Sequence, residues 1–160
     1  MPVSVSREHW GALGKNRWYA AVEGCTPAHW PRGFKPAILK PVERAVGLWT
    51  TSYPLTRDGE VVAVDIPGHV PGHVSLAVYE DNDNDGGRQT TYSLTGNAAY
   101  GIDLLEAEQQ GGINSDPDRA LESLLLIKEF ARRTEVVVLP SHDVNTPRLL
   151  AERVVYKPSN

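Results

Sequence analysis

Two copies of Pro-Gly-His stand side by side in the segment "DIPGHVPGHVSL", which begins at Asp65. Each copy ends in a histidine, at His69 and His73, and an imidazole can bind a metal ion or carry a proton near neutral pH. A third histidine follows an apolar run in "VVVLPSHD", where His142 precedes Asp143. These side chains are the first candidates for metal binding or acid–base catalysis.

The segments around these histidines have the pattern of strands. The runs "GEVVAVDI", "VSLAVYE" and "QTTYSLTG" are short, rich in β-branched and aromatic residues and separated by turn residues, which predicts three strands. The run "TEVVVLP" is apolar throughout, which is typical of a strand buried on both faces. His142 would then lie just after the C-terminal end of this strand, where the functional residues of sheets flanked by helices usually lie.

Helical patterns precede and follow these strands. In "SDPDRALESLLLIKEFARR", Asp116 can cap a helix and Pro117 suits its first position. Side chains then recur at helical spacing, at Leu121, Leu124, Leu125 and Lys128. Ser6 is a candidate N-cap for an early helix over "REHWGAL", and Asn145 or Thr146 can cap a short last helix. The order of helix, strands, helix, strand and helix predicts a mixed α/β (α+β) fold.

The polar run "DNDNDGG" resembles the opening of a calcium-binding loop, with Asp81, Asp83 and Asp85 at alternating positions. The twelfth position of such a loop must be a bidentate glutamate, and here it is Tyr92. The flanking segments are also predicted strands and not helices. We therefore predict a solvated hairpin loop that does not bind calcium.

The chain has 160 residues, the size of one domain, and its net charge is −4. No stretch is rich in lysine and arginine, so nucleic acid is not an expected partner. No signal peptide opens the sequence and no apolar run approaches the roughly 20 residues that span a bilayer. We therefore expect a cytoplasmic protein without membrane partners. Cys25 stands alone, so we interpret it as a structural or merely tolerated thiol.

Four motifs occur in a fixed order along the chain: "PGHVPGHVSLAV", "SLTGNAAY", "ESLLLIKEFA" and "VVVLPSHD". In this order they resemble the C-terminal half of the metallo-β-lactamase superfamily, most closely the lactonases that open acyl-homoserine lactones. The segment "PVSVSREHWGAL" also resembles the strand and helix that follow the main metal motif of that family. The resemblance implies half of an αββα sandwich, a mixed β-sheet with helices on one face, in a single truncated domain over residues 1–160.

The resemblance carries the site residues of the family onto this chain one by one. His69 and His142 match metal-binding histidines, and His73 matches the second histidine of the doublet, which is not a ligand. Tyr100 matches a tyrosine that polarises the carbonyl of the substrate. Asn97 falls where the family has an aspartate whose carboxylate bridges two metal ions.

Two departures argue against the dinuclear zinc centre of the family. Its His-x-His-x-Asp-His motif is absent from the sequence. Asn97 replaces the one anionic ligand of this half, and an amide cannot match a carboxylate between two dications. A catalytic zinc usually has three protein ligands, whereas His69 and His142 supply two. We expect no metal cofactor, or a single weakly bound zinc completed by Asp143, His73 or a partner chain.

A chain with half of a sandwich would leave the inner face of its sheet in water, and large exposed apolar patches are rare on monomers. An obligate homodimer is the simplest solution, because one surface then serves both chains. The dimer would also form a pocket for a small-molecule substrate, walled by Trp30, Phe34 and Trp49, with Asn97 contacting the substrate. The alternative is that these aromatic side chains fill the core.

Three functions remain open on the sequence. The first is an enzyme of secondary metabolism that acts on a small carbonyl or lactone compound without a dinuclear zinc centre. His142 and Asp143 would serve as acid and base, and Tyr100 would donate a hydrogen bond to a carbonyl or enolate oxygen. His69 and His73 would shuttle a proton, unless they only bond the backbone of their turn. Such groups suit lactone opening or closing, isomerisation, elimination or cyclisation.

The second function is a zinc-dependent lactonase completed by a missing N-terminal half or by a partner chain. The third is a non-catalytic binding or scaffold protein that keeps only the fold. No motif in the sequence selects a particular acyl chain, sugar or polyketide as the substrate.

Overall fold

The structure is a computed structural model that describes residues 3–22, 24, 26–82 and 88–159. Cys25 lies outside the described residues, as does the tip of the "DNDNDGG" loop, so the interpretations of both stay predictions. The strands flanking that loop are present, because β5 (Val74–Asn82) pairs antiparallel with β6 (Arg88–Gly96). The predicted hairpin is therefore confirmed up to its tip.

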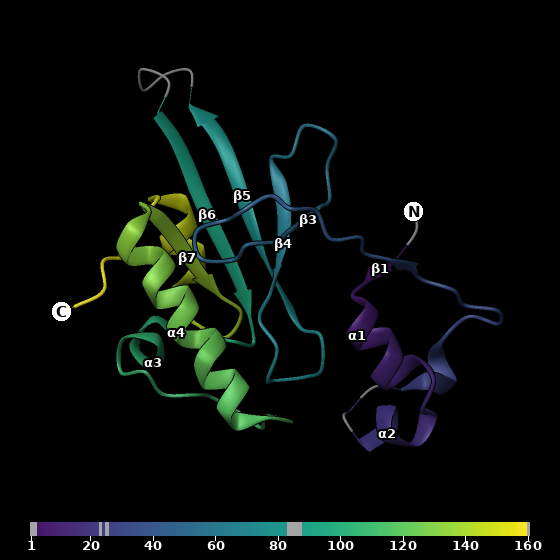
Figure 1. Cartoon of the computed structure of the whole chain (residues 1–160). Coiled ribbons are helices and arrows are strands. Elements are labelled where there is room, and N and C mark those ends of the chain that lie inside the picture. The colour runs from purple at the N-terminus through teal and green to yellow at the C-terminus, as the bar shows by residue number, and fades with distance from the viewer. Residues whose placement is uncertain (1–2, 23, 25, 83–87, 160) are drawn as a thin grey trace.

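The centre of the molecule is a mixed sheet of five strands in the order β3-β4-β5-β6-β7 (Figure 1). The remaining strands are β3 (Tyr53–Pro54), β4 (Val61–Asp65) and β7 (Val136–Pro140). Neighbours from β3 to β6 pair antiparallel, whereas β6 and β7 pair parallel. This parallel pair ends at the same edge of the sheet, so the residues that follow β6 and β7 are brought together there.

Helix α4 (Pro117–Arg133) covers one face of the sheet, as Figure 1 shows. The Asp116 side chain accepts a hydrogen bond from the Arg119 N–H at 3.1 Å, and Pro117 takes the first turn, which confirms both predicted start signals. The buried stripe of the helix contains Leu124, Ile127, Phe130 and Ala131. Leu125 was predicted in this stripe but is 38% exposed, because it lies about 100° around the helix from Leu124.

The other face of the sheet is only partly covered. Helix α5 (Thr146–Ala151) places Leu149 against Tyr92, Val137 and Leu139. Since Val136 and Val138 pack on the opposite side toward α4, β7 is buried on both faces, as predicted. Beyond α5 the same face holds a cavity of about 560 Å³, whose lining includes Val78, Leu94, Leu139 and Leu150 together with Tyr79, Tyr92, Glu60 and Glu80.

A small N-terminal lobe lies beside the sheet (Figure 1). It contains β1 (Ser4–Val5) and β2 (Ala37–Ile38), which pair in parallel, and α1 (Arg7–His9) and α2 (Arg17–Val22) with a π-helical turn over Trp10–Gly14 between them. A 3₁₀ turn spans Pro27–His29. The predicted N-cap Ser6 accepts a hydrogen bond from the His9 N–H at 3.1 Å.

The lobe contacts the doubled PGH segment. The Ser6 hydroxyl donates to the Gly72 carbonyl at 2.7 Å, and His9 Nδ1 donates to the Pro71 carbonyl at 3.1 Å. An ion pair between Glu8 and Arg119, at 3.0 Å, ties the lobe to α4. Among the described helices none is both long and apolar enough to cross a membrane.

Candidate functional site

The doubled PGH segment forms the tight connection between β4 and β5, and its glycines allow close packing on two sides. Gly68 has a φ of +129°, and a Cβ there would lie 2.2 Å from the Ala120 backbone nitrogen of α4. Gly72 has a φ of +64°, and a Cβ there would lie 2.3 Å from the Ser6 hydroxyl oxygen. Only glycine fits both the backbone and the space. The turn therefore holds His69 and His73 between α4 and the N-terminal lobe.

Asn97 follows directly after β6 and joins two of the histidines. Its Nδ2 donates to His69 Nε2 at 2.9 Å, and its Oδ1 accepts from His142 Nε2 at 3.2 Å. His69 comes from the turn before β5, whereas His142 comes from the end of β7. We call this arrangement the Asn97 bridge. It connects three segments that are up to 73 positions apart in the sequence.

Tyr100 stacks on one of the bridged histidines. Its ring lies 4.5 Å from the His142 ring, centroid to centroid, with 20° between the planes. The His69 ring approaches Tyr100 at 6.3 Å in an edge-on arrangement. Tyr100 and His142 line a cavity of about 520 Å³ together with the segments 101–104 and 143–145. The sequence predictions for His69, Asn97, Tyr100 and His142 therefore converge on one place.

The carboxylate of Asp143 accepts hydrogen bonds from two backbone N–H groups. One carboxylate oxygen accepts from the Ile102 N–H at 3.0 Å, at the start of α3 (Ile102–Glu106), and the other accepts from the Asn145 N–H at 2.8 Å. The hydrogen bond from Ile102 is the largest of the causes that hold the pKa of Asp143 below its usual value. Both oxygens thus fix the chain after β7, so the acid–base role predicted for Asp143 would compete with these bonds.

His73 is partly buried, as is His69, whereas His142 is exposed. The His73 ring lies 5.7 Å from the His69 ring, and a Cβ at Gly96 would lie 2.8 Å from its Nε2. Its Nδ1 is buried and has no hydrogen-bond partner among the described residues. Burial lowers the pKa of His73 to about 4, with smaller contributions from His69 and His9. His73 is therefore neutral at physiological pH.

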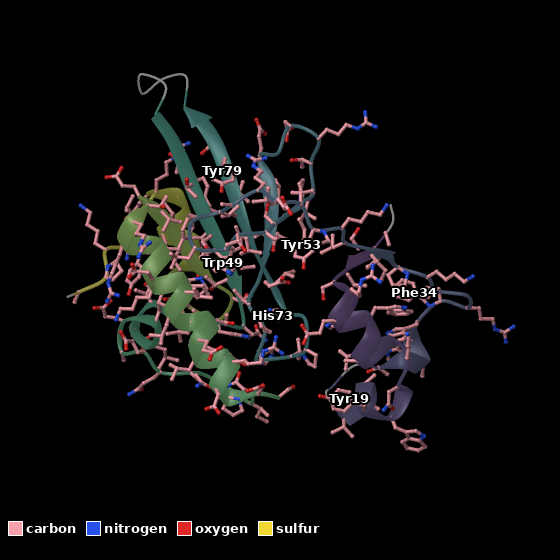
Figure 2. All side chains as sticks on the ribbon, in the orientation of Figure 1. Tyr19, Phe34, Trp49, Tyr53, His73 and Tyr79 are labelled. Carbon is pink, nitrogen blue, oxygen red and sulfur yellow. The ribbon has the colours of Figure 1, made fainter. Side chains whose placement is uncertain are left out.

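The predicted aromatic wall lies elsewhere. Trp30 and Phe34 cluster with Trp10 in the N-terminal lobe, with ring centroids 5.8 to 5.9 Å apart. They line a separate cavity of about 410 Å³, and Figure 2 shows Phe34 far out on the lobe while His73 lies near the end of the sheet. Trp49 is a core residue that packs on Phe130 at 5.6 Å. The position of Trp30 and Phe34 in a proline-rich loop does not reveal where they pack. That depends on the N-terminal lobe, in which the loop packs against the helices of the lobe.

The donor set does not fit a dinuclear metal centre. The Nε2 atoms of His69 and His142 are both hydrogen-bonded to the Asn97 amide, which carries no charge. Within residues 3–22, 24, 26–82 and 88–159, no three histidine, cysteine, aspartate or glutamate side chains are grouped so that they could hold an ion. A catalytic zinc usually needs three protein ligands. These residues alone do not provide them.

Sequence reasoning missed one part of the site. Gly111 and Gly112, in the loop between α3 and α4, pack along the Tyr100 ring. The pair stands out in "QQGGIN" as two adjacent glycines, the signal for a close backbone approach. Nothing in the sequence indicated which side chain the backbone approaches.

Comparisons with solved structures show that the fold of this chain matches about half of the fold of lactonases. An N-acyl homoserine lactone hydrolase with the product N-hexanoyl-L-homoserine at its catalytic metal centre matches with a TM-score of 0.63 and 23% identity, over 92% of this chain and 49% of that chain. A mutant of AiiA from B. thuringiensis with N-decanoyl-L-homoserine bound at the active site matches over the same shares, with the same identity and TM-score. A quorum-quenching N-acyl homoserine lactone lactonase matches over 99% of this chain and 54% of that chain, at 22% identity and a TM-score of 0.63.

Among curated proteins, the N-acyl homoserine lactonase AttM of Rhizobium radiobacter is 29% identical over 91 residues, which are 57% of this chain and 32% of that protein. No family model matches the sequence. The chain spans about half the length of the solved lactonases and about a third of AttM. The fold thus matches about half of the fold of solved lactonases, which agrees with the predicted mixed α/β fold and the predicted likeness to that half, whereas the predicted dimer stays a prediction.

The depressed pKa of His73 predicts an acid-sensitive fold. Above pH 6.5 the imidazole is neutral in both the folded and the unfolded chain, so its contribution to stability is fully present. Between pH 6.5 and about 4, His73 binds a proton in the unfolded chain but not in the folded chain, so the free energy of unfolding falls. The loss amounts to at most about 3 kcal/mol. Urea unfolding of wild type and His73→Gln between pH 7 and 4 measures it.

The expected result is that His73→Gln has a flatter dependence of stability on pH than wild type. His29→Gln is the matched control, because His29 is exposed in the N-terminal lobe. Parallel pH profiles for wild type and His73→Gln would contradict the placement of a neutral, enclosed imidazole at this position.

Proposed function

We propose that this chain acts on a lactone or a related small carbonyl compound by acid–base catalysis, without a dinuclear zinc centre. The lactonase fold and the cavity beside Tyr100 and His142 support the substrate class. The Asn97 bridge is the single observation that carries the proposal. It binds the Nε2 atoms of His69 and His142 and at the same time sets the tautomers of these two side chains.

The two ends of the amide set different tautomers. Because Nδ2 of Asn97 donates, His69 Nε2 must accept, and the proton of neutral His69 then lies on Nδ1. Because Oδ1 of Asn97 accepts, His142 Nε2 must carry a proton, which leaves Nδ1 as the basic nitrogen of His142. His142 is exposed, so its basic nitrogen can reach a substrate or a water molecule. His142 is therefore the proposed general base.

Tyr100 completes the proposed reaction. Its hydroxyl group would donate a hydrogen bond to the carbonyl oxygen of a lactone, which stabilises the negative charge that develops there. Water adds to the carbonyl carbon as His142 Nδ1 takes its proton, the ring C–O bond breaks, and the same proton passes to the leaving alkoxide. The product is the hydroxy acid. Lactone closure is the reverse of these steps.

A zinc lactonase completed by donors from outside this chain is the second candidate. It is favoured by the solved hydrolase whose product lies at a catalytic metal centre. In that case His69 and His142 would leave Asn97 and turn their Nε2 atoms toward the ion. The two candidates differ in what metal removal does to the activity.

Hydrolysis of N-hexanoyl-L-homoserine lactone and γ-butyrolactone by chelator-treated protein tests the proposed function. We expect ring opening to persist after chelation and to fall about 100-fold or more in His142→Ala. Tyr100→Phe should lower kcat with little change in KM, because its hydrogen bond strengthens in the transition state. His29→Ala is the control for loss of an exposed histidine.

Loss of activity on chelation, with recovery on adding zinc and two tightly held zinc ions per chain by elemental analysis, would establish the second candidate. Absence of turnover with both lactones, with the enzyme folded, would contradict catalysis on this substrate class.

The substitution Asn97→Asp tests the part played by the amide. A carboxylate at this position adds a negative charge between His69 and His142 and supplies a third metal ligand. We expect zinc affinity, measured by isothermal titration calorimetry, to rise at least about tenfold relative to wild type. The isosteric change leaves volume constant, and Asn114→Asp serves as a control for added charge elsewhere. Equal zinc affinity in wild type and Asn97→Asp would refute the view that the amide excludes the ion.

We further propose that the chain forms a homodimer through the sheet face opposite α4. That face carries a cavity of about 560 Å³, lined mainly by aliphatic and aromatic side chains with Glu60 and Glu80, and exposes 38% of Leu94 and 50% of Leu150. A two-fold axis would bring the same face of each chain into contact, so that each face buries the other. A second sheet face is a suitable partner for this surface, since sheets commonly pack face to face about 10 Å apart.

Light scattering of Leu94→Lys measures the dimer contact. We expect wild type at micromolar concentration to have twice the 17.6 kDa mass of one chain, and Leu94→Lys to have the single mass, because a buried lysine would be desolvated. Leu125→Lys is the matched control, since Leu125 is also 38% exposed but lies on α4. A monomeric wild type, or a Leu125→Lys variant that dissociates equally, would argue against this interface.

A further inference from the structure

The loop of residues 107–116 between α3 and α4, which we call the glycine strap, is held firmly at its start. The Nζ of Lys128 donates to the Glu106 carbonyl at 2.7 Å and to Glu108 Oε1 at 3.0 Å. Lys128 is only 4% exposed, so these bonds satisfy an ammonium group buried in α4. Glu108 has a φ of +56°, which turns the strap away from α3.

The end of the strap is bonded to the PGH turn. The backbone N–H and the hydroxyl group of Ser115 both donate to the His69 carbonyl at 3.1 Å. The Asp116 N–H donates to the Gly68 carbonyl at 2.9 Å. The strap thus runs from the end of α3 to the backbone of the candidate metal-binding histidine and crosses Tyr100 on the way.

The middle of the strap lies along the Tyr100 ring. A Cβ on Gly111 would lie 2.6 Å from Tyr100 Cγ, and a Cβ on Gly112 would lie 2.2 Å from the Tyr100 hydroxyl oxygen. The two glycines therefore follow the ring from its root to its hydroxyl group. Since His142 stacks on the ring as well, both the strap and the imidazole contact the Tyr100 ring.

Such contacts leave no space for a side chain at either glycine. Real Cβ atoms do not approach other atoms this closely, so any substitution must displace either Tyr100 or the strap. The strap is bonded at both ends, whereas the tyrosine ring can turn about its χ angles toward the cavity beside it. A larger residue would therefore move the hydroxyl group and change the stacking on His142.

We infer that Gly111 and Gly112 are positioning residues, which set the place of the Tyr100 hydroxyl group relative to His142. The inference rests on the proposed function for its catalytic consequence, but the positioning itself does not require turnover. A shift of the hydroxyl group by about 1 Å can lower a rate by about 100-fold.

Three alanine substitutions separate crowding of Tyr100 from backbone strain. Gly111→Ala adds crowding without strain, because Gly111 has no left-handed φ. Gly24→Ala adds strain without crowding, because Gly24 has a φ of +80° and nothing within 4 Å of an added Cβ. Gly112, with a φ of +68°, combines the two. Urea unfolding confirms that each variant is folded before any other comparison.

The first measurement is the NMR chemical shift of the His142 ring protons, assigned by their loss in His142→Gln. A stacked tyrosine ring shifts these protons, so we expect them to move in Gly111→Ala and Gly112→Ala and to stay in place in Gly24→Ala. Unchanged shifts in both crowded variants, or an equal change in Gly24→Ala, would overturn the inference.

The second measurement is the hydrolysis of N-hexanoyl-L-homoserine lactone. Gly112→Ala should lower kcat about 10- to 100-fold, and should lower it no further in a Tyr100→Phe background, because the effect passes through the hydroxyl group. Additive losses in that background would overturn it. If the ring protons move as expected while wild type opens no lactone, the proposed function fails and the positioning role stands.

Discussion

The Asn97 amide makes hydrogen bonds to two imidazoles, and this interaction joins the three segments that form the candidate site. It is possible because β6 and β7 are parallel and end at the same edge of the sheet, where the PGH turn also lies. A neutral amide has one donor and one acceptor end, so it imposes different tautomers on His69 and His142. A carboxylate at the same position would accept from both and attract a cation instead. The chemistry open to the site therefore depends on one atom of Asn97 being nitrogen and not oxygen.

Four glycines allow the neighbouring parts of the molecule to pack closely on the candidate site. Gly68 and Gly72 let α4 and the N-terminal lobe approach the PGH turn, and Gly111 and Gly112 let the strap lie on Tyr100. Buried Lys128 and the backbone of the turn hold the strap at its two ends. The side chains of the candidate site are thus positioned mainly by close backbone contacts, which tolerate little displacement. Asp143 contributes in the same way, by binding the start of α3.

The relation to solved lactonases concerns the fold alone. The chain matches about half of each of these structures, at 22% to 23% identity. The sheet face opposite α4 is the surface left partly open in this half, and it carries exposed Leu94 and Leu150. At the sheet edge the described residues place histidines and a tyrosine around a neutral amide, without a group of three side chains that could hold a metal ion.

Local patterns in the sequence predicted the main strands and the long helix, and the resemblance of its motifs to lactonases indicated the candidate site residues. Period and capping signals located α4 and the apolar β7, because helix caps and side-chain alternation depend on near neighbours. The order of motifs also indicated His69, Tyr100 and His142. Only the tertiary structure decided that Asn97 bonds both histidines, that Trp30 and Phe34 pack in the N-terminal lobe, and that Gly111 and Gly112 lie on Tyr100. Those contacts join residues distant in the chain, and their geometry arises from how the sheet, strap and lobe pack, which no local pattern encodes.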